Sequence, residues 1–138
     1  MKVVRKIIKD VLIFRRAEEA GRDDIQTARD LADTLGANRD ICVGMAANMI
    51  GVNKRIIAFT VGPMVVTMIN PRITKRLGGS YVTEEGCLSL DGVRKTTRYN
   101  RIEVEYLDMS FERHRQEYAG FIAQIIQHEI DHCDGKVI

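Results

Sequence analysis

The last twenty residues combine an apolar stripe with a His-Glu-x-x-His motif, and this combination constrains the fold more than any other feature of the chain. From Ala119 onward, Phe121, Ile122, Ile125 and Ile126 recur at the helical period. The stripe leads directly into the motif residues His128, Glu129 and His132. We therefore predict a buried helix that carries the motif and that other elements must cover.

The motif allows a metal site on this helix. Positions i and i+4 share one helix face, so His128 and His132 can present two imidazoles to one ion, with Glu129 beside them to handle protons. A catalytic metal needs a third protein ligand and an open position. Alternatively, the two histidines only satisfy core hydrogen bonds or face solvent.

The candidates for a third ligand are the cysteines, His114 and any carboxylate. His114 lies in the charged run ERHRQE, where a solvated side chain is the usual outcome. Cys133 points about 100° away from His132 around the helix and is expected to be a core thiol. Cys87 follows the glycine-containing LGGS stretch, expected to be a flexible loop, and begins a predicted short strand in EEGCLSL, where Gly86 allows close backbone approach.

The rest of the chain predicts one helix followed by strands. Residues 23–38 have apolar side chains at helical spacing, with Asp23 or Asp24 as the N-cap and Gly36 as the stop. The β-branched runs 55–61 and 64–70 flank Gly62-Pro63 and predict a hairpin. Residues 102–106 alternate as a half-buried strand does, and residues 111–118 predict a more exposed one. This order indicates an α+β fold with the last helix packed against antiparallel sheet.

Length and charge exclude several classes of protein. A chain of 138 residues, 45% of them apolar, suits one compact domain. The net charge of +2 is spread over 21 basic and 19 acidic residues, which predicts no nucleic-acid or membrane partner. No apolar run reaches about 18 residues, and three widely spaced cysteines favour reduced thiols, so we expect a cytoplasmic protein.

Three segments together resemble the peptide deformylase family. They are VGMAANMIGV at 43–52, EGCLSL at 85–90 and QHEIDHCDG at 127–135, in the family's order and rough spacing. The resemblance spans about Asp23 to Gly135 and includes INPRI after the hairpin. It implies that Cys87, His128 and His132 are metal ligands and that Glu129 is the catalytic acid and base.

The resemblance also implies a fold, a reaction and a cofactor. The fold is α+β, with antiparallel sheets around a central C-terminal motif helix, and residues 1–138 would form one catalytic domain with an abbreviated C-terminus. The reaction removes the formyl group from the initiator methionine, so the partner would be a formylated peptide or nascent chain N-terminus. One divalent ion is expected, with iron(II) physiological and zinc, nickel or cobalt possible.

By the same resemblance, other residues would contact the substrate. The backbone N–H of Leu88 would stabilise the oxyanion, and Val43 and Gly44 would lie along the peptide. Arg94 resembles a family residue near the substrate, although a surface cation is an equal alternative.

The chain departs from the family pattern at several site positions. Met49 stands where the family has a glutamine whose amide stabilises the oxyanion, and a thioether donates no hydrogen bond. Asn48, one position earlier, would point to the opposite side if the segment is extended. Cys42 replaces a glycine, so a left-handed backbone there would be strained. Gln124 puts a polar amide where an apolar residue usually lines the methionine pocket.

Three hypotheses follow from these features. The first is a metal-dependent deformylase or close amidase relative, weakened or redirected by Met49 and Gln124. The second is a catalytically impaired paralogue that binds a peptide or protein. The third is a cysteine hydrolase that uses Cys87 with a histidine base, although paired helical histidines fit a metal better.

Overall fold

The computed structural model describes residues 2–138. Its elements in chain order are η1 (Val11–Ile13), η2 (Arg22–Asp24), α1 (Ile25–Ala37), β1 (Gly44–Ala46), η3 (Ala47–Ile50), β2 (Ile56–Val61), β3 (Met64–Gly86), β4 (Val93–Leu107), β5 (Arg113–Ala119) and α2 (Gly120–Cys133). The strands form one antiparallel sheet in the order β1-β2-β3-β4-β5. The predicted α+β class is confirmed.

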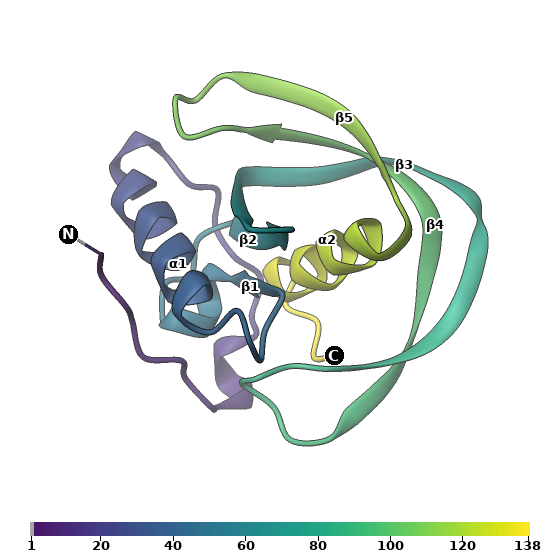
Figure 1. Ribbon diagram of the computed structural model, residues 1–138, viewed down its shortest axis with the longest axis horizontal. Helices are drawn as coiled ribbons and strands as arrows, with labels where there is room; N and C mark the ends of the chain where they lie inside the picture. Colours follow the sequence, from purple (N-terminus) through teal and green to yellow (C-terminus); the bar gives the residue numbers. More distant parts are fainter. Residues whose placement is uncertain (1) are drawn as a thin grey trace.

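Helix α2 lies in the middle of the molecule, with β1 and β2 between it and α1 (Figure 1). The curved hairpin of β3 and β4 wraps around the far side of α2. Two apolar clusters result from this layering. One includes Leu31 of α1 and Ile56 of β2, and the other includes Ile102 of β4 and Ile126 of α2. The motif helix is thus enclosed, as its apolar stripe predicts.

The long hairpin of β3 and β4 is interrupted by three register shifts. Register shifts occur between Ile69 and Arg72, Ile73 and Lys75, and Leu77 and Ser80. Such bulges add twist and bend a strand. The LGGS stretch at 77–80 belongs to the last of these shifts, with Gly78 and Gly79 at positive φ. The prediction of a flexible loop there was wrong, because both sides of the bulge remain paired with β4.

The other predicted elements are confirmed with local differences. Helix α1 includes Gly36 and ends at Ala37, so this glycine does not stop it. Phe121 is 62% exposed and therefore lies off the buried stripe of α2. Strand β5 is rich in charged residues, and nearly all of its side chains are exposed, as expected. In residues 2–138 there is no helix with the length and apolar character that crossing a membrane requires.

Candidate functional site

A cavity of about 450 Å³ opens between β1, the end of β3 and α2. Most of the site residues predicted from the sequence line it, namely Val43, Gly44, Met49, Cys87, Leu88, Gln124, His128 and Glu129. His132 lies behind His128 and is fully buried. Arg94 lies on β4 outside the lining, and its guanidinium donates to the backbone oxygen of Asp91 at 3.4 Å.

The three predicted metal ligands converge beneath this cavity. Donor atoms of Cys87, His128 and His132 all lie within 4.8 Å of one another. The helical i,i+4 spacing brings the two Nε2 atoms to 2.7 Å, and the turn after β3 brings the thiol to them. A thiol and two imidazoles suit a divalent transition metal. The donor set therefore fits such an ion chemically.

His128 is oriented by a buried carboxylate. Its Nδ1–H donates to Oε1 of Glu85 at 2.7 Å, which leaves Nε2 directed at His132. Arg98 in turn donates to both oxygens of Glu85 and to Asp131 Oδ2, the latter at 2.6 Å. A carboxylate behind a histidine fixes its tautomer and its ring orientation, and this is how proteins support metal-binding histidines.

The electrostatic environments of the two histidines differ. Burial disfavours a charged His128, but the hydrogen bonds that the charged ring donates to Cys87 and Glu85 outweigh it and raise the pKa of His128 to about 10. Burial, followed by the charge of His128, lowers the pKa of His132 to about 3. His132 is thus a neutral imidazole ready to act as a ligand, whereas His128 must release a proton before it binds a metal.

Glu129 is a buried carboxyl group that is free to exchange a proton. Burial raises its pKa to about 7, and the charge of His128 opposes this rise. Its Oε1 is buried and has no hydrogen-bond partner within residues 2–138. A carboxyl group with a pKa near neutrality is suited to general acid and base catalysis.

Gly44 lets the backbone of β1 approach Glu129 closely. A Cβ atom at this position would lie 2.9 Å from Glu129 Oε2 and 2.6 Å from the Cγ2 of Ile125. We expect Gly44→Ala to displace the carboxylate and lower kcat by about 10²-fold, since small displacements of reacting groups have effects of this size.

The matched control for this prediction is Gly36→Ala. A Cβ at Gly36 meets nothing within 4 Å, and this glycine lies inside α1. The control should raise stability by about 0.5–1 kcal/mol and leave kcat unchanged. Steady-state kinetics and thermal melting of both variants test the pair, and a fully active Gly44→Ala would show that the close approach has no catalytic importance.

The segment around Met49 forms a short 3-10 helix, η3, rather than an extended strand. Met49 is only 1% exposed and packs in the apolar cluster of Leu31 and Ile56, and it also lines the cavity. Asn48 is buried, and its Nδ2 donates to the backbone oxygen of His132 at 2.9 Å. The segment is not extended, because the chain turns at Ala47, and Asn48 is absent from the residues that line the cavity. Asn48 instead ties η3 to the end of α2.

Cys42 and Leu88 both line the cavity. Cys42 is absent from the residues with positive φ, so replacing glycine causes no left-handed strain. Its thiol donates to the backbone oxygen of Gly44 at 2.9 Å. Leu88 follows Cys87 in the turn after β3 and not in a strand, and the turn is closed by the Leu90 N–H donating to Cys87 O at 3.0 Å.

The structure adds residues that the sequence does not identify. Glu85 and Arg98 are buried together, and Gln124 donates from Nε2 to Glu85 Oε2 at 2.8 Å. Asp131 completes the group from within the motif helix. The sequence gives one indication of this group, because Glu85 lies close to Cys87 and Asp131 lies next to His132. It does not show that Arg98, eleven residues after Cys87, contacts both carboxylates.

Comparison with known proteins identifies a single family. The family model for polypeptide deformylase matches residues 2–138. A peptide deformylase from Clostridium beijerinckii is 54% identical over 137 residues, which cover 99% of this chain and all of that protein. A peptide deformylase from Pelotomaculum thermopropionicum is 39% identical, over 96% of this chain and 87% of that protein.

Solved structures of the same kind share the fold. The crystal structure of peptide deformylase from Thermotoga maritima gives a TM-score of 0.84 at 30% identity, covering 96% of this chain and 92% of that one. A class I type b peptide deformylase from Acinetobacter baumannii bound to Met-Ala-Ser gives 0.85 at 29% identity, covering 97% and 96%. The arrangement of strands around the motif helix is thus common to all three.

Proposed function

Because this chain belongs to the peptide deformylase family, we propose that it is a metal-dependent hydrolase that removes the N-formyl group from the initiator methionine of nascent proteins. The observation that carries the proposal is the convergence of Cys87, His128 and His132 to within 4.8 Å, beside the buried carboxyl group of Glu129. The peptide would enter through the cavity that this group underlies.

In this proposal Cys87, His128 and His132 hold one divalent ion. Iron(II) is the proposed physiological metal, with zinc, nickel and cobalt able to occupy the same donors. Such an ion supplies Lewis-acid polarisation of the formyl carbonyl and lowers the pKa of water. Glu85 keeps His128 in the tautomer that frees its Nε2 for binding.

The chain's own groups would move the protons and hold the substrate. Glu129 takes a proton from the attacking water at its carboxylate and later passes it to the departing amine, and a pKa near 7 suits both directions. The N–H of Leu88 would donate to the oxyanion. Strand β1 is the edge of the sheet and begins at Gly44 on the cavity wall, so an extended peptide can add beside Val43 and Gly44. The role of Arg94 stays a prediction.

A second candidate function is a paralogue that binds formylated or related peptides without turnover. Met49 favours it, because this side chain lines the cavity but has no donor for an oxyanion. A cysteine hydrolase would need Cys87 to act without metal. Metal removal therefore separates this third hypothesis from the other two.

The test is turnover of a formyl-Met-Ala-Ser peptide by protein purified without oxygen and loaded with iron(II). We expect release of formate, little activity on the acetyl analogue, and loss of activity after chelation with recovery on adding iron. Peptide binding without turnover by metal-loaded protein would contradict the deformylase and support the paralogue. Full activity in chelator would instead support a cysteine hydrolase.

A further inference from the structure

We propose that Gln124 is a positioning residue that fixes the carboxylate of Glu85, and through it the ring of His128, so that the wall of the substrate cavity is linked to retention of the metal. This inference rests on the proposed function, since it assigns a role toward the metal that Cys87, His128 and His132 would hold. It concerns a position where the sequence predicts only a less favourable pocket for methionine.

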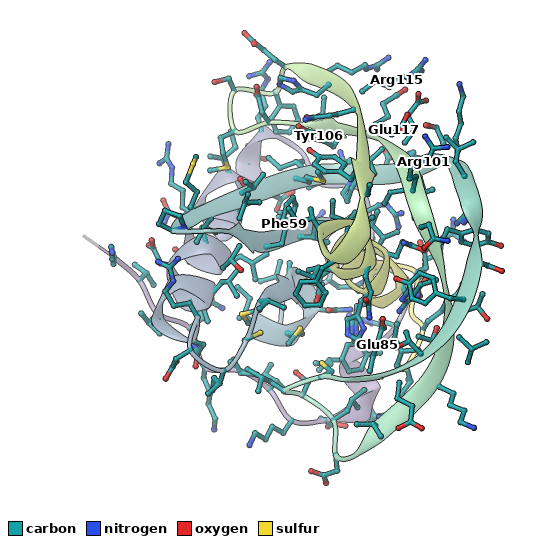
Figure 2. The ribbon with its side chains drawn as sticks, turned by 45° about the vertical axis from the view of Figure 1, so that its right-hand side comes forward. Phe59, Glu85, Arg101, Tyr106, Arg115 and Glu117 are labelled. Atoms are coloured by element: carbon teal, nitrogen blue, oxygen red, sulfur yellow. The ribbon has the colours of Figure 1, made fainter. Side chains whose placement is uncertain are left out.

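The link consists of two short hydrogen bonds in series. Gln124 Nε2 donates to Glu85 Oε2 at 2.8 Å, and Glu85 Oε1 accepts from His128 Nδ1 at 2.7 Å. Gln124 and His128 lie one turn apart on α2, while Glu85 faces them from the end of β3, beside the helix in Figure 2. The carboxylate thus bridges two successive turns of the helix.

Arg98 does not make Gln124 redundant. The shortest hydrogen bond from Arg98 to Glu85 runs from Nη2 to Oε1, at 2.6 Å. Oε2 accepts a single bond from Arg98, which Nε donates at 3.0 Å. Gln124 is therefore the closer donor to Oε2. Without it, a carboxylate that is only 9% exposed loses part of its hydrogen bonding and can turn toward Arg98. Such a turn would change the acceptor presented to His128.

Tyr81 sets the orientation of the amide. Its hydroxyl donates to Gln124 Oε1 at 3.4 Å, which leaves Nε2 directed at Glu85. The same glutamine lines the cavity with Phe121 and Ile125. A substrate side chain in the cavity would therefore touch the residue that holds Glu85. The polar amide of Gln124 would then make less apolar contact with the substrate, but it would hold the ligand His128 more firmly through Glu85.

The experiment measures metal release from cobalt(II)-loaded protein after addition of excess chelator. Gln124→Leu and Gln124→Met remove the donor, and the methionine keeps the length of the side chain. We expect both to release cobalt about tenfold faster than the wild type, as losses of supporting residues around metal ligands do. The Nδ1 resonance of His128 should also shift in both variants, which a residue that only fills space would not cause.

The matched control is Gln26→Leu. Like Gln124, Gln26 donates its side-chain amide to a carboxylate, in this case Asp30 Oδ1 at 2.9 Å, one turn further along α1. Unlike Gln124, it lies on the exposed side of its helix. This variant should release cobalt at the wild-type rate. Thermal melting of the metal-free proteins verifies that the Gln124 variants are folded at the assay temperature.

The outcomes separate this inference from the proposed function. Wild-type release rates and an unmoved Nδ1 resonance in Gln124→Met, in a protein that binds cobalt and deformylates, would overturn the inference alone. A wild-type protein that binds no metal would overturn the proposed function and the inference together. Faster release in both Gln124 variants with an unchanged Gln26→Leu supports the link.

Discussion

Glu129→Ala is expected to lower kcat for deformylation by about 10²–10⁴-fold and to leave the metal content unchanged. General acid and base catalysis contributes factors of this size. The carboxyl group is buried, its pKa is raised to about 7, and its Oε1 has no hydrogen-bond partner in residues 2–138. It is therefore placed to exchange protons and is not needed to hold the fold through an ion pair.

Two further variants make this prediction specific. Glu129→Gln keeps the size of the side chain and cannot accept the proton, so it should be as inactive as the alanine variant. Glu112→Ala removes an exposed carboxylate and should retain full activity. Steady-state rates on a formylated peptide, with metal analysis of each protein, provide the measurement. Substantial activity in Glu129→Gln would assign the proton transfer to another group.

Met49→Gln is expected to raise kcat by about 10²–10³-fold. Oxyanion donors contribute factors of this size, and the family has a glutamine at this position. Methionine and glutamine are unbranched and similar in length, and the Met49 side chain lines the cavity from η3. The new amide would therefore lie next to the cavity, at a residue that also packs in the apolar cluster of Leu31 and Ile56.

The control for this gain is Met64→Gln. Met64 is 64% exposed at the start of β3, so the same change should leave kcat unaltered there. The measurement is kcat and KM for both variants with the same metal. An unchanged kcat in Met49→Gln would show that another donor stabilises the oxyanion, or that the chain is a binding paralogue whose catalysis is limited elsewhere.

The motif helix and the ligands were predictable because their signals are local. The apolar stripe of α2 and the i,i+4 spacing of His128 and His132 depend only on neighbouring residues. Cys87 is distant in sequence from both histidines, and it was chosen by its resemblance to a family motif. The structure brings its sulfur to the two imidazoles, as that resemblance implies.

The features that the sequence did not reveal depend on contacts between distant segments. Arg98 reaches both Glu85 and Asp131 only because β3 pairs with β4 from Ile69 to its end at Gly86. The two glycines of the bulge at Gly78 and Gly79 are also typical of loops. Only the pairing of the flanking residues with β4 makes this segment part of a strand. The turn into η3 at Ala47 was not predicted, and in it Asn48 donates to the backbone oxygen of His132. Local propensity alone cannot resolve these cases.

The central claim is that Cys87, His128 and His132 hold one divalent metal. Elemental analysis of protein purified without oxygen tests it most directly, with Cys42→Ala as the control thiol from the same cavity. We predict about one equivalent of metal in the wild type and in Cys42→Ala, and a large loss in Cys87→Ala, because a catalytic site of this kind needs all three protein ligands. Wild-type protein without metal, or Cys87→Ala with a full equivalent, would contradict the claim.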